Sequence, residues 1–161
     1  MKWHAAEIND LAKIDQELRK KLESEDSKTL WDKINKVDRE NTKRLKSIVA
    51  DIGLPTISKV GKKASCNAWL LVQHSPDLKF QKAYLKMMLK HKNDIALKNI
   101  AFLTDRILMY EGKRQIYGTQ VSFDKKTNRW ELYQVTDKKK LNRLRKEMGL
   151  GTIEKYLRGF C

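Results

Sequence analysis

The predicted fold is centred on residues 60–81, which read VGKKASCNAWLLVQHSPDLKFQ. Small residues lead into the run Trp69-Leu70-Leu71-Val72, which has no polar side. A helix that is apolar on every side has no solvent face and must be central. The helix should stop at Ser75-Pro76, because proline disfavours helical geometry at the residue before it. We therefore predict a buried central helix that carries two polar side chains, Gln73 and His74, at its C-terminal end.

The length of 161 residues predicts a single domain, spanning 1–161, with a sizeable core. The chain has 35 Lys and Arg against 20 Asp and Glu, a net charge of +15. This excess permits binding to nucleic acid or to an anionic membrane, but it also simply keeps a small protein soluble. Nucleic acid is not the favoured partner, because no basic stretch is interleaved with aromatic residues and no helix-turn-helix, zinc or aromatic-platform motif is found.

The cysteine content and the hydropathy of the sequence indicate the cellular compartment in which the protein is expected. Cys66 and Cys161 offer no disulfide framework. No segment is apolar for long enough to span a membrane, and the N-terminus lacks the apolar region of a signal peptide. We expect a cytoplasmic protein, or a secreted or periplasmic one if a signal segment has been removed.

Hydrophobic periodicity predicts a mainly α fold, a compact bundle-like domain with one β-hairpin near the C-terminal third. Turn and capping residues set the approximate boundaries. The predicted helices span about 6–23, 28–52, 62–74, 76–91, 95–111, 137–148 and 151–158, and the hairpin spans about 114–135.

Three of these helices place an acid on the apolar side: Asp15, Asp38 and Asp105. Buried acids are normally paired, and Arg19, one turn beyond Asp15, suits an i,i+4 ion pair. Taken alone, each acid is therefore most simply explained as the partner of a basic residue in a structural ion pair. Several costly core acids on separate elements, together with His74, instead suggest convergence on one site.

Three segments carry a resemblance: GLPTISKVGKKASCNAWLLVQH at 53–74, LTDR at 103–106 and GKRQIYGTQ at 112–120. With Asp38-x-x-Asn41 and a closing Arg145-x-x-x-Gly149-Leu150, the chain resembles an uncharacterised bacterial domain-of-unknown-function family over nearly its whole length. Leu144 departs from the pattern, which has another Arg there. The resemblance implies that the polar positions belong together, and it implies no activity.

The matching polar residues form the candidate site. The expected catalytic residues are His74, as a general base, and Asp105 or Asp38, which would orient it. We expect His74 and Asp105 to lie within one direct or water-bridged contact. The expected substrate-binding residues are Arg106, Arg19, Asn41, Gln73, Gln115, Tyr117, Thr119 and Gln120.

Residues Gln115 to Gln120 are predicted as a strand. Alternation would put Gln115, Tyr117 and Thr119 on one face, and a bulge at Gly118 would turn Tyr117 and Gln120 towards His74. The bland alternative is a hairpin edge with glycine in a bend.

No motif requires a cofactor. The chain has no Gly-rich phosphate loop and no Cys/His zinc spacing, and Cys66 lies too far along its helix from His74 to act as its nucleophile. A divalent metal is permitted; its ligands would come from His74, Asp38, Asp105 and Asp15, although nothing fixes their spacing.

Three functions follow from this inventory. The first is a hydrolase-like acid–base enzyme on a small polar or anionic substrate, held by the two arginines and by donors of the 115–120 strand. The second is a non-catalytic module in which the same groups bind a ligand, a protein or a peptide. The third is nucleic-acid binding through the Lys-rich surface. The sequence leaves open whether the protein is an enzyme.

Overall fold

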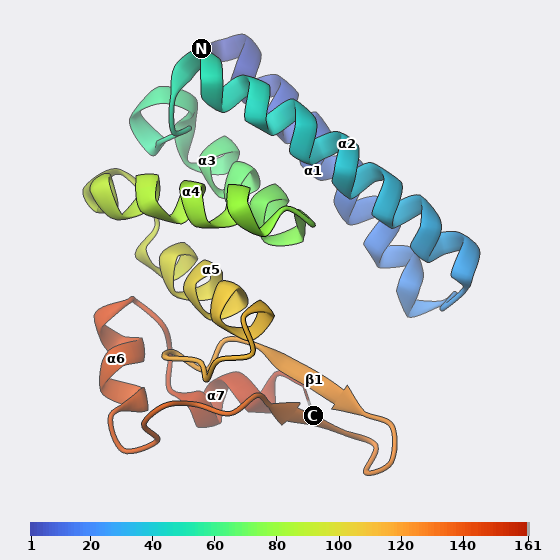
Figure 1. The fold of residues 1–161 in the computed structure, drawn as a ribbon, viewed down its shortest axis with the longest axis vertical. Helices are drawn as coiled ribbons and strands as arrows, with labels where there is room; N and C mark the ends of the chain where they lie inside the picture. Colours follow the sequence, from blue (N-terminus) through green and yellow to red (C-terminus); the bar gives the residue numbers. More distant parts are fainter. Residues whose placement is uncertain (161) are drawn as a thin grey trace. The chain divides into compact units, whose positions relative to one another are not determined.

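A computed structural model describes residues 1–160 and shows the predicted mainly helical fold with one hairpin (Figure 1). The contacts group the chain into two compact units, Met1–Ile95 and Ala96–Cys161. The first unit contains α1 (Lys2–Lys20), a short 3-10 turn (Lys21–Glu23), α2 (Lys28–Ile52), α3 (Ile57–His74), α4 (Leu78–Lys90) and a second 3-10 turn (Lys92–Asp94). The second contains α5 (Leu97–Tyr110), β1 (Val121–Asp124), β2 (Arg129–Leu132), α6 (Leu141–Glu147) and α7 (Ile153–Arg158).

In the first unit, α1 and α2 lie side by side and α3 packs against α1 (Figure 1). Small side chains line the α1 and α3 faces, where Ala12, Ala64 and Ala68 are buried. Small residues at a helix contact let the two backbones approach closely, because the interaxial distance depends on the side chains between them. The remaining core is aliphatic and comes mainly from Ile8, Leu30, Ile34, Leu45, Ile48, Leu71 and Val72.

The central helix differs from the prediction in its burial. Within α3 a first helical turn begins at Ile57, where the Thr56 carbonyl accepts from the N–H groups of Lys59 and Val60. Gly61, at φ +82° and ψ 160°, is not helical and separates this turn from the predicted helix at 62–74; glycine adopts this backbone angle without steric cost. Trp69 and Leu70 are only half-buried, so the helix is not enclosed on every side as predicted.

The contacts at the helix ends explain why α5 starts later than the predicted residue 95. Ser27 and Asp77 cap α2 and α4 through the N–H groups of Leu30 and Phe80. The side chain of Asp94, three residues before α5, accepts from the Ser58 N–H at 2.9 Å. The α5 helix therefore starts at Leu97, and its N-cap residue Ala96 supplies no side-chain hydrogen bond.

The second unit holds the two-stranded antiparallel sheet. Its register pairs Val121 with Leu132 and Phe123 with Trp130. The predicted first strand was too long: residues 115–120 form a loop, and only an isolated bridge joins Gln115 to Val135. The physical reason is that Asp105 takes the N–H groups that a strand would donate to its neighbour. Among residues 1–160, no helix combines the length and the apolar character needed to cross a membrane.

Candidate functional site

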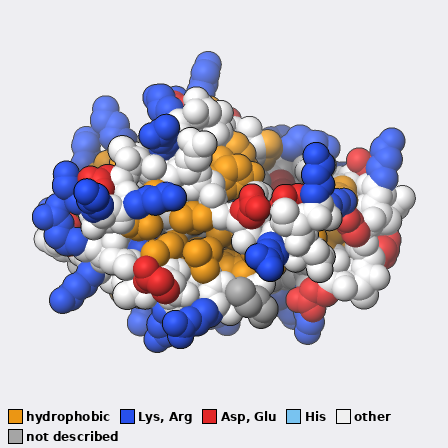
Figure 2. Space-filling view, turned by 90° about the horizontal axis from the view of Figure 1, so that it is seen from below, with side chains coloured by type: hydrophobic (Ala, Val, Ile, Leu, Met, Phe, Trp, Pro, Cys, Tyr) orange, Lys and Arg blue, Asp and Glu red, His pale blue; other side chains and the backbone are white. Residues whose placement is uncertain are grey.

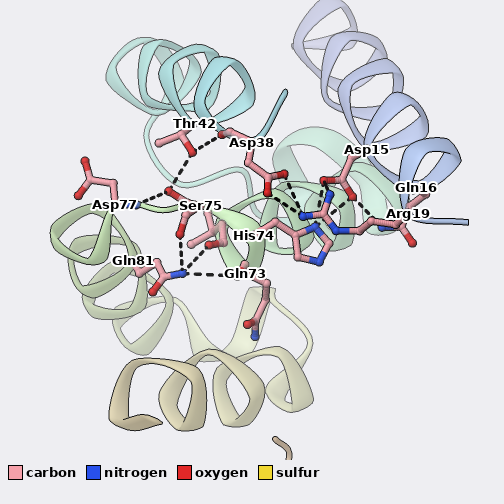
Figure 3. A network of polar contacts seen from close by, with 11 residues as sticks. Asp15, Gln16, Arg19, Asp38, Thr42, Gln73, His74, Ser75, Asp77 and Gln81 are labelled. Carbon is pink, nitrogen blue, oxygen red and sulfur yellow. Dashed lines mark hydrogen bonds and ion pairs between the residues drawn. The ribbon is translucent and has the colours of Figure 1, made fainter. Parts of the chain in front are cut away.

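The polar end of α3 meets α1 at Asp15. The Nδ1 atom of His74 lies 3.0 Å from each carboxylate oxygen of Asp15. Asp15 is fully buried, whereas 18% of the His74 side chain is exposed. The ring's second nitrogen, Nε2, points away from the carboxylates (Figure 3). The imidazole is therefore held through one nitrogen only.

Arg19 joins Asp15 to Asp38, which comes from α2 (Figure 3). One guanidinium nitrogen donates to Asp15 at 2.6 Å, and the other donates to both oxygens of Asp38 at 3.0 and 2.8 Å. Gln16 also donates to Asp15, at 2.7 Å. The predicted i,i+4 pair between Asp15 and Arg19 is confirmed, and the same guanidinium also holds Asp38.

The two carboxyl groups experience opposite net effects. Burial would raise the pKa of Asp15, but the hydrogen bond and charge of His74, then Gln16 and Arg19, together lower it. Burial raises the pKa of Asp38 and outweighs the hydrogen bond and charge of Arg19. Two carboxylates and one guanidinium leave one negative charge uncompensated whenever His74 is neutral. The cluster therefore favours a proton or a cation over an anion.

Polar contacts behind the cluster fix the end of α3. The Thr42 hydroxyl donates to the Asp38 backbone carbonyl at 2.7 Å and lies 2.9 Å from the Ser75 Oγ atom. The buried Gln81 amide donates to the carbonyls of Val72 and Ser75 at 3.1 and 3.0 Å. These carbonyls belong to the last turn of α3 or follow it, where helices leave such groups without partners. The contacts therefore fix the backbone on either side of His74.

Asn41 follows Asp38 by one turn on the inner face of α2. Its side chain is buried, with 4% exposed, and its Nδ2 atom has no hydrogen-bond acceptor within the described part of the chain. A buried amide donor without a partner costs free energy and calls for an explanation, such as a water or a ligand. Gln73, the other amide at the end of α3, is also buried.

The second unit contains a separate polar cluster around Asp105, which is fully buried. One oxygen accepts from the N–H groups of Ile116 and Tyr117 at 2.8 and 3.1 Å. The other accepts from the N–H of Thr119 at 3.0 Å and from its hydroxyl at 2.9 Å. Burial raises the pKa of Asp105, and these donors act against it. This carboxylate organises the 115–120 loop.

The glutamines of the loop hold it to itself and to the segment after β2. Gln115 donates to the carbonyls of Gln120 and Tyr133 at 3.0 and 2.7 Å, and its oxygen accepts from the Gln120 N–H at 2.8 Å. The Gln120 amide lies 3.1 Å from the Thr119 hydroxyl. Within this unit, these predicted ligand-binding groups are used by the loop itself.

Two arginines of the second unit, Arg145 and Arg106, belong to the family pattern. Arg145 of α6 is buried and donates to the carbonyls of Tyr117, Gly118 and Gly151 at 2.7 to 3.0 Å. Its guanidinium lies 4.9 Å from the centre of the Tyr156 ring. Arg106, a predicted substrate ligand, lies over the Tyr110 ring at 5.9 Å.

The structure thus brings the predicted site residues together in two groups. Asp15, Arg19, Asp38 and His74 form the first, and Asp105, Tyr117, Thr119, Gln115 and Gln120 form the second. The carboxylate that contacts His74 is that of Asp15 and not that of Asp38. The sequence analysis gave Asp15 as an ion-pair partner of Arg19 and a possible metal ligand, but not as the residue that orients His74. The predicted contact between His74 and Asp105 stays a prediction.

Sequence reasoning missed residues that complete these groups: Gln16, Thr42, Ser75, Gln81 and Arg145 were not among the candidate site residues. A usable signal existed for Gln81, because polar side chains just beyond a helix end can bond the unpaired carbonyls of its last turn. Arg145 was part of the family pattern, but its carbonyl ligands depend on a loop conformation that the periodicity did not reveal.

The cluster of the first unit also offers ligands for a metal. One atom from each of Asp15, Asp38 and His74 lies within 4.8 Å of the others. Two carboxylates and an imidazole suit a divalent ion such as Mn²⁺ or Zn²⁺. Arg19, however, already bonds both carboxylates, so a metal would have to replace these ion pairs.

Comparison with known proteins gives one relationship. No curated protein and no solved structure matches the chain. A family described as a family of unknown function, DUF6624, matches residues 5–160, which is nearly the whole chain. The chain therefore belongs to the DUF6624 family, as its resemblance to a domain-of-unknown-function family predicted.

Proposed function

We propose that the protein is a hydrolase-like acid–base enzyme in which His74 is the general base and Asp15 orients it. The observation that carries the proposal is the contact of His74 Nδ1 with both oxygens of Asp15, at 3.0 Å each. A carboxylate that holds one nitrogen of an imidazole fixes the tautomer and stabilises the imidazolium that forms.

The chemistry of the pair follows from its donors and acceptors. An ionised carboxylate can only accept hydrogen bonds, so the proton of a neutral His74 ring belongs on Nδ1. The lone pair is then on Nε2, which makes no hydrogen bond to any described residue. This nitrogen could take a proton from a water molecule or a substrate hydroxyl. Asp38 would act indirectly, by holding Arg19 against Asp15.

The charges refine the expected substrate. Arg19 already makes three hydrogen bonds to carboxylates, which leaves little of its charge for an anion. We infer a polar substrate that is neutral or cationic, in place of the anionic one that the sequence also allowed. The unpartnered Nδ2 group of Asn41 is the donor that we assign to it.

A divalent cation at Asp15, Asp38 and His74 is the second candidate, favoured by the mutual reach of their ligand atoms within 4.8 Å. The two candidates differ in what happens to Arg19. A general base keeps both ion pairs, whereas metal binding releases the guanidinium. A non-catalytic ligand-binding module would keep the geometry but show no turnover.

The test is turnover on a panel of chromogenic esters, amides, phosphoesters and glycosides. His74→Asn and Asp15→Asn should each lower kcat by about 10²-fold or more, the usual range for loss of general-base catalysis. His91→Asn is the matched control, because His91 is exposed and lies outside the cluster. Turnover that His74→Asn leaves unchanged would contradict the proposal.

Two further measurements separate the alternatives. The ¹⁵N shifts of His74 should report a protonated Nδ1 and a free Nε2 in the neutral ring, and Asp15→Asn should change them. Calorimetric titration with Mn²⁺ or Zn²⁺ should show no binding that depends on Asp38. Stoichiometric metal binding abolished by Asp38→Asn would favour the second candidate.

A further inference from the structure

The hairpin exposes large aromatic side chains on one face. Phe123 and Trp130 are direct cross-strand partners, with ring centres 5.5 Å apart, and 43% and 45% of these residues is exposed. The Phe160 ring lies 5.3 Å from Trp130, and that of Tyr156 lies 5.2 Å from Phe160. A continuous row of rings therefore runs from Tyr156 of α7 through Phe160 to the hairpin.

Unpaired cations surround these rings. Lys125 and Lys126 are in the hairpin turn, Arg129 begins β2, and none of the three forms an ion pair with a described residue. Residues 96–161 contain 15 Lys or Arg but only 7 Asp or Glu. Figure 2 shows exposed hydrophobic side chains gathered on one face, with Lys and Arg side chains and a smaller number of Asp and Glu side chains along their border.

The acids of this unit are largely used elsewhere. Asp105 is enclosed by its loop, Glu111 pairs with Lys113, and Asp137 pairs with Lys140. Glu147 pairs with Arg143, and Glu154 accepts from Asn142. Asp124, which accepts from the Lys126 N–H and lies opposite Arg129, and Glu131 belong to the hairpin itself and offset part of this charge. Three cations, Lys125, Lys126 and Arg129, against these two acids leave a net charge of +1 in the hairpin for a partner to neutralise.

From this juxtaposition we propose that the hairpin surface of Phe123, Trp130, Lys125, Lys126 and Arg129 binds single-stranded nucleic acid. Exposed bases stack on aromatic rings, and the phosphates between them are held by nearby cations. The sequence analysis found no basic stretch interleaved with aromatics, but the β register assembles one by opposing residues seven positions apart. A duplex is the weaker ligand, because its base faces are already stacked.

An anionic membrane surface would use the same charges and is the main competitor. Peripheral membrane segments bury Leu as well as Trp and Phe in the lipid. The exposed large hydrophobic side chains of this hairpin and the residue after it are all aromatic: Phe123, Trp130 and Tyr133. The aliphatic neighbours on the same face, Val121 and Leu132, are only half-exposed. The rings therefore supply the most exposed apolar surface, and flat rings favour base stacking over insertion.

The test is fluorescence anisotropy of a labelled oligothymidine of about 20 nucleotides with the full chain. Trp130→Ala should weaken binding by about five- to a hundredfold, the usual effect of losing one stacked base. Trp31→Ala is the matched control: Trp31 is also 45% exposed, but it donates to Asp26 in the first unit and should have little effect. Trp130→Phe keeps a ring and the hairpin packing, so it should lose less than Trp130→Ala.

A second pair of variants tests the contribution of the positive charges to binding. Lys125→Ala/Lys126→Ala should weaken binding and reduce the slope of log affinity against log salt by about 1.4, since each phosphate contact contributes roughly 0.7 for a single strand. Lys86→Ala/Lys90→Ala on α4 removes the same charge from the first unit and should change both quantities much less.

Four results would overturn the proposal. The first is that the oligonucleotide does not bind at about 50 mM salt, and the second is that the protein binds a duplex of the same length equally well. The third is that Trp130→Ala keeps full affinity for the oligonucleotide, and the fourth is that Trp130→Ala and Trp31→Ala lose equal affinity. Binding to phosphatidylserine vesicles through Trp130, without oligonucleotide binding, would assign the surface to membranes instead.

Discussion

Replacing Arg19 by Met removes the one cation that serves two carboxylates. Met is close to Arg in length and apolar, so it keeps the contacts of the Arg stem while deleting the guanidinium. The change leaves Asp38, with 10% of its side chain exposed, without its guanidinium partner, and removes one of the three partners of the fully buried Asp15. The free energy of unfolding should therefore fall substantially at pH 7.

The magnitude follows from the burial of both partners. Breaking a buried ion pair by removing one member costs about 3–5 kcal/mol, because the other charge is left uncompensated. The Arg19 side chain is 22% exposed, so water can relieve part of this loss, while two carboxylates are affected instead of one. We expect about 3 kcal/mol at pH 7 and, for a chain of this size, a fall in Tm on the order of 10 °C.

The pH dependence carries the diagnostic information. Burial already raises the pKa of Asp38 and Arg19 is the main group that lowers it, so without Arg19 this folded-state pKa rises further and the contribution of Asp38 to stability is lost as pH rises through it. The deficit of Arg19→Met should be largest at neutral pH and shrink as pH falls towards about 4, near the unfolded pKa of Asp. Adding Asp38→Asn should recover part of the loss at pH 7.

Urea unfolding of both proteins at several pH values is the measurement. Arg44→Met is the control, since Arg44 also joins α2 to α1, through Glu7, but its side chain is 42% exposed. It should lose much less stability than Arg19→Met. A deficit that is equal for the two variants at pH 7, or one that does not change with pH, would refute the reasoning.

Three other changes test the second unit and the cluster's acid response. Asp105→Asn should lower the free energy of unfolding by about 1–3 kcal/mol, because an amide N–H₂ would face the N–H groups of Ile116 or Thr119. Hydrogen exchange should show faster exchange of the 116–119 amides. Unchanged protection of these amides would contradict the role of Asp105. Gly118→Ala and Gly112→Ala should destabilise by similar amounts in urea melts, because both have positive φ, +61° and +69°, and at Gly118 the new Cβ would make only ordinary contacts, the nearest at 3.4 Å from Ile153. The left-handed backbone costs about 1–2 kcal/mol for a residue with a Cβ, so a much larger loss for one of the two variants would contradict this reasoning. Because the pKa of Asp15 is lowered in the folded state, its stabilisation should be present above the unfolded pKa and lost as pH falls through the folded pKa. Asp15→Asn should therefore flatten the fall of stability below about pH 4, the unfolded pKa of Asp, relative to the native protein. An unflattened curve would exclude that contribution.

Local sequence determined the helices, because periodicity and capping act over a few residues. The apolar stripe of α2, with Asp38 and Asn41 interrupting it, predicted a helix at 28–52, and the structure has Lys28–Ile52. The Asp15–Arg19 pair was also readable, since four residues is one helical turn. The stop after His74 followed from Pro76 for the same local reason.

Tertiary structure decided the partners and the loops. That Arg19 reaches Asp38, 19 positions away, depends on how α1 and α2 align, and no local pattern sets that alignment. Likewise, residues 115–120 alternate like a strand, yet Asp105 from α5 captures their N–H groups and makes them a loop. Leaving a buried carboxylate without hydrogen-bond donors costs more free energy than leaving a short strand unpaired. Periodicity records which side of an element is buried, but the contact that satisfies each buried charge is fixed only when the elements pack.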